Sequence, residues 1–284
     1  MEIKGLGDDN ILKISHIKEE DEWALKYRID SYHNFLKLGL PDFGPKIELD
    51  FDNIIYYKSR QESEIKNNWN DINCSVKNEL DNLGVLESEK HLDGIGVQYE
   101  SEVIYHNMLS ELEEKNVIFT SIEVAMKKYP ELVKKYFGKI VSNNENKFAA
   151  LNGAVFSGGS FIYIPPNTTL DRPLQSYFRI NSRNMGQFER TLIIVDDNSH
   201  LHYVEGCTAP TYSDSSLHAA VVEIYVGKNS SCRYSTIQNW APNVYNLVTK
   251  RALVDENGVM EWIDGNIGSR LTMKYPCCVL KGDN

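Results

Sequence analysis

The chain has 284 residues, of which 42% are hydrophobic and 25% are charged, and its formal net charge is −10. These values indicate a soluble globular protein, because no uncharged apolar run approaches the ~18 residues that a membrane-spanning helix needs. The acidic balance argues against nucleic-acid binding. Five cysteines at irregular spacings do not suggest a disulfide framework, and the N-terminus resembles no secretory signal, so we expect a reducing compartment inside a cell or organelle.

The first half of the sequence predicts helices. Trp23, Tyr27 and Phe35 recur near helical spacing before the Gly-Leu-Pro break at 39–41, which predicts a helix over 20–38. Further helices are predicted over 75–83, 100–115 and 121–137, the last divided at Pro130.

From about Lys147 the sequence changes to short runs rich in β-branched and aromatic residues, beginning with AALNGAVFSGGSFIYIP, which predict strands. The Gly158-Gly159 pair is interpreted as a tight turn between two strands rather than a phosphate loop. Strand spacing alone suits a sandwich, a barrel or a β-solenoid equally. We therefore divide the chain into a helical region over 1–145 and a mainly β region over 146–284.

One strand of the β region has a polar face. Alternation places Tyr177, Arg179 and Asn181 on one face and Phe178 on the other. An inward arginine needs an anionic partner, and Glu189 on the following strand is the candidate. The alternative is a solvent-facing pair of little consequence.

Cys207 ends a strand within the segment Glu205-Gly206-Cys207-Thr208-Ala209-Pro210. This position predicts a thiol that backbone amides can approach, with His202, Glu205 and His218 as candidate neighbours that favour its activation. The alternative is a small buried hydrophobic residue with no reactivity.

Other motifs carry weaker information. His200 and His202 have the H-x-H spacing of some metal sites, but no third ligand is fixed by the sequence. The adjacent Cys277 and Cys278 point to opposite faces of a strand and are interpreted as structural. No nucleotide-binding or hydrolase motif is present, so we expect this chain to bind no nucleotide.

A collinear series of segments resembles the SufB family, the scaffold subunits of the Suf iron–sulfur cluster assembly system. The resemblance covers nearly the whole chain and includes DEWALKYRIDSYHNFLKLGLPDFGP (21–45), GVQYESEVIYHN (96–107), NKFAALNGAVFSGGSFIYIP (146–165), HYVEGCTAP (202–210) and YSTIQNWAPNVYNLVTKRA (234–252).

The resemblance implies an α+β, mainly β fold in which an N-terminal helical region precedes a right-handed parallel β-helix. It implies a scaffold rather than an enzyme, on which a transient iron–sulfur cluster is built with sulfur accepted as persulfide. The implied partners are SufD or a second SufB, the SufC ATPase, and a desulfurase of the SufS–SufE type. The implied location is the cytoplasm or the stroma of a plastid-type organelle, with no membrane or nucleic-acid partner.

The resemblance also implies roles for individual residues. Cys207 matches the sulfur acceptor, and His202 and His218 are candidates for supporting its thiolate. The polar lining of the sulfur path matches Arg179, Asn181, Glu189, Thr236, Gln238 and Trp240. The resemblance assigns no metal ligand, and we do not transfer a cluster-ligand role to Cys277 or Cys278.

SufB proteins normally continue through the end of the β-helix into helices that bind SufC. The last residues, MKYPCCVLKGDN, follow a strand-like stretch without a capping element. We therefore expect a fragment or a shortened protein with an exposed β-helix end, prone to self-association and unable to bind SufC tightly.

Two other functions remain open. A structural partner of the SufD type would leave Cys207 inert. A β-helix enzyme acting on polysaccharide would need two facing carboxylates, which the scattered acids of the β region do not suggest.

Overall fold

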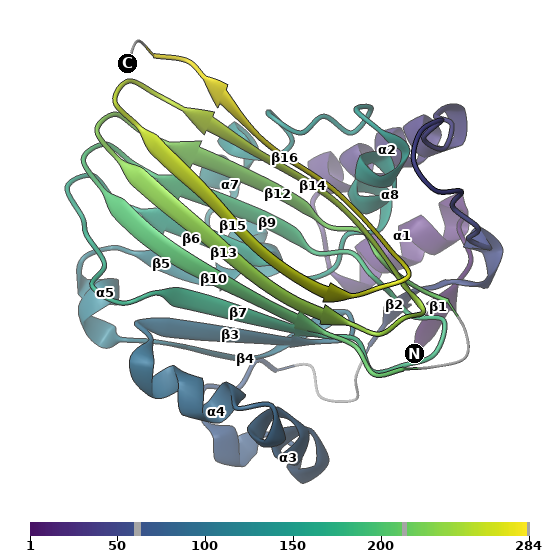
Figure 1. The fold of residues 1–284 in the computed structure, drawn as a ribbon, viewed down its shortest axis with the longest axis horizontal. Helices are drawn as coiled ribbons and strands as arrows, with labels where there is room; N and C mark the ends of the chain where they lie inside the picture. The colour runs from purple at the N-terminus through teal and green to yellow at the C-terminus, as the bar shows by residue number, and fades with distance from the viewer. Residues whose placement is uncertain (60–63, 212–214, 283–284) are drawn as a thin grey trace.

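The computed structural model describes residues 1–59, 64–211 and 215–282. Helices from the first part of the chain pack around two stacked sheets whose strands run mainly parallel (Figure 1). The predicted fold class, an N-terminal helical region followed by a parallel β-helix, is confirmed. In the described ranges, no helix is long and apolar enough to cross a membrane.

The α-helices confirm most of the helical predictions. They are α1 (Asp8–Ile17), α2 (Glu22–Lys37), α3 (Cys74–Asn82), α4 (Val85–Ser88), α5 (Ser110–Glu114), α6 (Ile122–Lys128), α7 (Pro130–Tyr136) and α8 (Lys147–Val155). Single turns of 3-10 helix lie at Phe51–Asn53, Trp69–Asp71 and Glu89–His91. The predicted helices over 20–38 and 75–83 correspond to α2 and α3, and Pro130 divides α6 from α7 as expected.

Two local predictions are wrong. The predicted helix over 100–115 is instead a strand, β4 (Glu102–Met108), followed by α5, because pairing with a neighbouring strand overrides the helical spacing. The predicted strand over the Ala-rich stretch after Asn146 is α8, whose first turn is capped by the Asn146 side chain accepting from the amides of Phe148 and Ala149. The Gly158-Gly159 turn accordingly joins a helix to a strand.

The β-helix has two long sheets. The order in the first sheet is β4, β3 (Gly94–Tyr99), β7 (Leu174–Arg179), β10 (His200–Thr208), β13 (Ser231–Trp240) and β15 (Val259–Gly268). The second contains β5 (Ile118–Ser121), β6 (Ser160–Ile164), β9 (Arg190–Val195), β12 (Val221–Val226), β14 (Val244–Val254) and β16 (Leu271–Leu280), with β8 (Gly186–Gln187) and β11 (Ser216–His218) beside them. A separate antiparallel pair is β1 (Glu2–Lys4) with β2 (Ile55–Lys58).

Successive passes of the chain alternate between the two sheets, so β7, β10, β13 and β15 stack in parallel register, as do β9, β12, β14 and β16. Each strand therefore points every second side chain into the space between the sheets. Strands β3, β4 and β5, from the first 145 residues, belong to the same two sheets.

An asparagine ladder marks one row of stacked turns. Asn167, Asn198, Asn229 and Asn257 all have left-handed backbone conformations, with φ between 52° and 59°. Each later side-chain amide donates to the carbonyl oxygen of the preceding one, at 3.2, 3.2 and 3.1 Å. Asparagine tolerates this conformation better than most residues, which explains its repetition at these corners.

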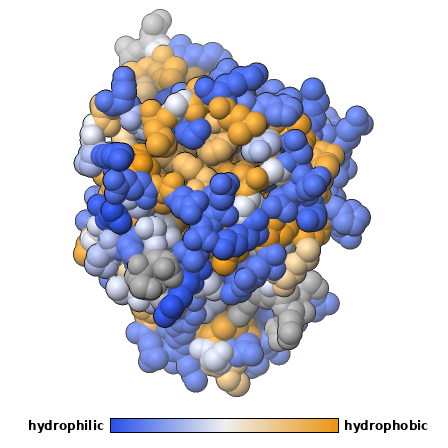
Figure 2. All heavy atoms as spheres, turned by 90° about the vertical axis from the view of Figure 1, so that its right-hand side faces the viewer, coloured by the Kyte–Doolittle hydropathy of each residue, from blue (hydrophilic) through white to orange (hydrophobic). Residues whose placement is uncertain are grey.

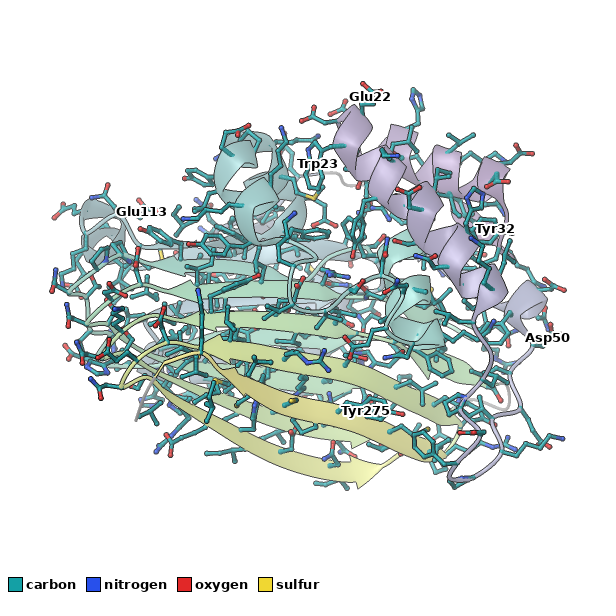
Figure 3. The ribbon with its side chains drawn as sticks, turned by 90° about the horizontal axis from the view of Figure 1, so that it is seen from above. Glu22, Trp23, Tyr32, Asp50, Glu113 and Tyr275 are labelled. Carbon is teal, nitrogen blue, oxygen red and sulfur yellow. The ribbon has the colours of Figure 1, made fainter. Side chains whose placement is uncertain are left out.

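Helices α2, α6, α7 and α8 lie on the outer side of the second sheet, whereas α3 and α4 pack against β3 and β4 of the first sheet. Figure 3 shows α2, which carries Trp23 and Tyr32, lying across the strands on the side away from the first sheet. Arg28 of α2 is fully buried and binds the Glu20 carboxylate together with the carbonyl oxygens of Ala154 and Phe156 at the end of α8. This arginine satisfies carbonyl groups at the C-terminal end of a buried helix.

A buried ion pair holds the segment after α7 against the second sheet. Arg190 and Glu223 are both fully buried and lie 2.7 Å apart, Nη2 to Oε2. The Glu223 carboxylate also accepts from the backbone amides of Gly138, Ile140 and Val141.

The last coil of the β-helix, which consists of β15 and β16, leaves apolar side chains exposed. The exposed large hydrophobic residues on its strands and on β13 are Ile237, Val259, Ile263, Ile267, Val279 and Leu280. Among the described strands, β15 and β16 each pair with a single neighbour. On another side of the molecule, at the right of Figure 1 where α1, β1 and β2 lie, Figure 2 shows hydrophobic residues gathered between hydrophilic ones.

We predict that Glu223→Ala lowers the free energy of unfolding by about 3–5 kcal/mol, because it leaves the Arg190 charge buried without its partner. Urea denaturation measures this loss. Glu261→Ala is the matched control, since it breaks the solvent-screened pair with Arg233 and should lower the free energy of unfolding much less. Equal losses in the two variants would contradict the prediction.

Candidate functional site

Cys207 lies inside the β-helix. Along β10, Leu201, Tyr203, Glu205 and Cys207 are the buried positions, and Cys207 itself is 0% exposed. We expected an accessible thiol at a strand end with its pKa lowered. The expected access is wrong, because alternation turns this side chain inward. The expected direction of the pKa shift is also wrong, because the pKa of the thiol is raised.

Two polar groups flank the Cys207 sulfur. Its thiol donates to Oε1 of Glu205 at 3.6 Å, and the side-chain amide of Gln238 donates to Sγ at 3.7 Å. Burial raises the pKa of the Cys207 thiol well above its usual value, and the Glu205 and Glu189 carboxylates raise it further. Lys274 and Lys250 act in the opposite direction.

Thr236, Gln238 and Trp240 share the inward face of β13, as alternation predicts. Gln238 lies opposite Cys207 in the register of β10 with β13. Its carbonyl oxygen accepts from the Trp240 indole N–H at 3.2 Å and from Nδ2 of Asn246 at 2.7 Å. Cys207 and Gln238 therefore meet directly inside the coil.

Glu189 and His218 form a buried pair, with Oε2 and Nε2 2.8 Å apart. The other ring nitrogen of His218 lies 2.7 Å from Oδ1 of Asn246. Burial alone lowers the pKa of His218, but the Glu189 charge and the hydrogen bonds outweigh it, so the pKa is raised.

Arg179 and Asn181 lie on the outer face of the first sheet. Phe178 faces Cys207 in register, so Arg179 points outward, where it pairs with Glu79 at 2.6 Å. The predicted Arg179–Glu189 pair is therefore wrong. The Asn181 side-chain amide donates to the Tyr99 hydroxyl on the same side as Arg179.

His202 also points outward. Its Nε2 lies 3.0 Å from the Ser235 hydroxyl on the outer face of β13. It cannot support the Cys207 thiolate, because the strand itself separates the two side chains.

Sequence analysis missed a group of charged residues inside the last coils. Lys250 is fully buried and donates to the Thr236 hydroxyl at 2.6 Å and to Asp264 at 3.2 Å. Lys274 binds the same Asp264 carboxylate at 2.8 Å. The available signal was a lysine within VYNLVTKRALV, a strand rich in apolar residues, where a buried charge must be paired.

The remaining candidates do not form a site. Within the described ranges, no group of three or more His, Cys, Asp or Glu residues could hold a metal ion. All five cysteines are free, and exposed Cys277 lies beside half-buried Cys278. Glu189 and Glu205 are buried and contact His218 and Tyr234, so neither carboxylate is open to a polysaccharide chain.

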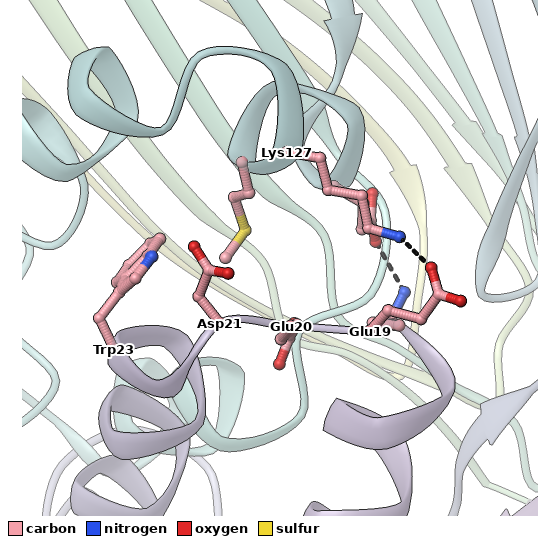
Figure 4. Close-up of a pocket in the computed structure, with 8 residues that line it drawn as sticks. Glu19, Glu20, Asp21, Trp23 and Lys127 are labelled. Atoms are coloured by element: carbon pink, nitrogen blue, oxygen red, sulfur yellow. Dashed lines mark hydrogen bonds and ion pairs between the residues drawn. The ribbon is translucent and has the colours of Figure 1, made fainter.

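A separate pocket of about 170 Å³ lies between the start of α2 and α6 (Figure 4). Its charged groups are largely paired with each other, Lys127 with Glu19 and Lys18 with Glu123, both at 2.8 Å. These pairs leave no cluster of free groups for chemistry, so we place the candidate site around Cys207.

Two family models match the chain. Residues 97–176 match the SufBD protein N-terminal region, and residues 178–284 match the SufBD core domain of SUF system FeS cluster assembly. The chain belongs to the SufBD family. The matches do not distinguish SufB from SufD.

Curated relatives of the chain are described as members of the same family. An iron–sulfur cluster assembly SufBD family protein of Staphylococcus saprophyticus is 57% identical over 282 residues, which are 99% of this chain and 60% of that protein. A protein of the same description from Staphylococcus aureus strain USA300 is 56% identical over the same shares. The chain thus spans 60% of the length of these relatives.

We predict that His218 stabilises the fold more at acidic than at alkaline pH. Its pKa is raised in the folded state, so its contribution is complete below the ordinary value of about 6.5 and is lost as the pH rises through the folded pKa. Urea denaturation of the wild type and His218→Gln at pH 6 and pH 9 measures this. A stability difference that does not shrink at pH 9 would contradict the prediction.

Proposed function

We propose that this chain contributes the sulfur-accepting β-helix of a SufBD-family iron–sulfur cluster assembly protein, with Cys207 as the acceptor. The observation that carries the proposal is the placement of the Cys207 thiol between a carboxylate and an amide donor, Glu205 at 3.6 Å and Gln238 at 3.7 Å. A carboxylate can remove the thiol proton, and an amide N–H can stabilise the thiolate that results.

The proposed step is a thiol–persulfide exchange. Cys207 passes its proton to Glu205, and the thiolate attacks the outer sulfur of a donor persulfide, R–S–SH. The donor S–S bond breaks, its electron pair leaves on R–S⁻, and this thiolate takes the proton from Glu205. The products are Cys207–S–SH and R–SH, so the step needs no oxidant or reductant.

The proposed sulfur path follows the interior of the β-helix toward its last coil. Lys250 and Lys274 both lie beside Asp264 there. Their positive charges oppose the rise in the pKa of Cys207 that burial causes. These cations favour anionic sulfur species. Glu189, Thr236, Gln238 and Trp240 remain candidates for the lining of this path, whereas Arg179 and Asn181 lie outside it.

We also propose the partners that the family resemblance implies. A desulfurase of the SufS–SufE type would supply the persulfide, and the SufC ATPase with SufD or a second SufB would complete the assembly. In this reading the chain is a scaffold without turnover of its own, and the cluster is its product.

A structural role with an inert Cys207 is the second candidate. Full burial and a raised pKa of the Cys207 thiol favour it, since the thiolate is the reactive form. The two candidates differ in whether sulfane sulfur is ever found on Cys207.

We predict that Cys207→Ser abolishes persulfide formation on the chain after incubation with a persulfide-loaded desulfurase and leaves the fold intact. Mass spectrometry of the peptides locates the added sulfur. Cys232→Ser is the matched control, because Cys232 is also buried on an inward face of the same sheet. Wild-type levels of sulfane sulfur on Cys207→Ser would reject the assignment.

A further inference from the structure

A row of buried side chains connects Glu189 to Cys207 across the interior of the β-helix. From Glu189 the contacts pass to His218, Asn246, Gln238 and the Cys207 sulfur, at 2.8, 2.7, 2.7 and 3.7 Å. All five residues are at most 3% exposed. Because the row is buried, each hydrogen-bonded group in it donates or accepts according to what its neighbour offers, and Glu189 contacts His218 as an ion pair.

Trp240 fixes the direction of this row. The indole N–H can only donate, and it lies 3.2 Å from the side-chain oxygen of Gln238. The opposite orientation would bring an amide NH₂ against the indole N–H, two donors facing each other. Gln238 therefore turns its carbonyl oxygen toward Trp240 and its NH₂ group toward the Cys207 sulfur.

The same logic extends to His218. Since Gln238 presents its oxygen, Asn246 must present its NH₂ group, and the Asn246 oxygen then faces Nδ1 of His218. Nδ1 must carry a proton to donate to that oxygen, and Nε2 must carry one to face the Glu189 carboxylate. His218 is thus the doubly protonated imidazolium, and Glu189 supplies the balancing charge.

We propose that Glu189, His218 and Asn246 are positioning residues, which act through Gln238 to hold an amide N–H on the Cys207 sulfur. In the exchange reaction, negative charge develops on this sulfur, and a fixed donor stabilises it without reorganisation. A structural role alone would require only that each buried group be paired, in either direction. The proposal deepens the function proposed above and rests on Cys207 being the acceptor.

The protonation state of His218 is the first test. In ¹⁵N NMR of the wild-type chain labelled at histidine, both ring nitrogens of His218 should be protonated at pH 7. The groups that face the ring are Glu189, Asn246 and the Trp240 ring, whose centroid lies 4.8 Å away, with Glu205 acting from farther off. An unprotonated Nδ1 would overturn the proposal, because Asn246 would then have to be reversed.

The second test reverses the row without touching Cys207 or Gln238. In Asn246→Asp, the new carboxylate can only accept, so it competes for the NH₂ group of Gln238 and draws it away from the sulfur. The probe is iodoacetamide, with the alkylation of each cysteine followed by mass spectrometry. Cys232 is the internal reference for opening of the coil, because it is buried inside the same sheet and burial raises its pKa to about 12.

Loss of one hydrogen bond to a charged sulfur predicts about a tenfold lower ratio of Cys207 to Cys232 alkylation in Asn246→Asp. Thr272→Asp is the matched charge control, since Thr272 pairs with Asn246 in register and accepts from its Nδ2 at 3.2 Å. Thr272→Asp adds the same charge on β16, beside the strand that carries Asn246. Its ratio of Cys207 to Cys232 alkylation should stay within about twofold of the wild-type ratio.

The proposal would be overturned if the ratio of Cys207 to Cys232 alkylation were the same in Asn246→Asp and the wild type. It would also be overturned if this ratio fell equally in Asn246→Asp and Thr272→Asp. Alkylation needs no sulfur donor, so this outcome is independent of persulfide transfer. If Cys207→Ser still accepts sulfane sulfur at the wild-type level, the proposed function fails whatever the alkylation ratios are.

Discussion

The burial of polar side chains between the two sheets determines the chemistry of this protein. A polar group enclosed there must be paired by other protein groups, because unpaired burial is costly. His218 is accordingly bound to Glu189, and Lys250 to Asp264. The same pairing fixes the orientation of the side chains that take part in it.

Alternation along the strands explains which parts of this interior could be predicted. It places Thr236, Gln238 and Trp240 on one face, and that face is inward. It equally places Arg179 and Asn181 together, but their face is outward. Period-2 patterns group side chains correctly and leave open which group is buried, since that depends on register with strands distant in sequence.

The other predictions of helices and strands are correct where local chemistry decides the structure and wrong where long-range pairing decides it. The helix before the Gly-Leu-Pro break and the division at Pro130 follow from local chemistry, and both are found. The strand over 102–108 depends on its antiparallel partner, which helical spacing cannot reveal. Asn246 went unnoticed because nothing in the strand around it indicates that it lies between His218 and Gln238.

Burial of Cys207 has opposite effects on stability and reactivity. The neutral thiol is suited to an interior position, and its raised pKa keeps it protonated. The sulfur transfer proposed above requires the thiolate, which forms when the proton moves to Glu205, and it requires a donor that reaches the interior of the β-helix. A resting state that is closed and unreactive also protects the thiol from oxidation.

The asparagine ladder has a consequence for how such a chain can change in length. Successive rungs are 31, 31 and 28 residues apart, so the corner stays aligned while the rest of a coil absorbs a difference of three residues. A coil contacts only the coils above and below it, which makes the architecture quasi-one-dimensional. Insertions are then tolerated either at the corners opposite the ladder or as one whole additional coil.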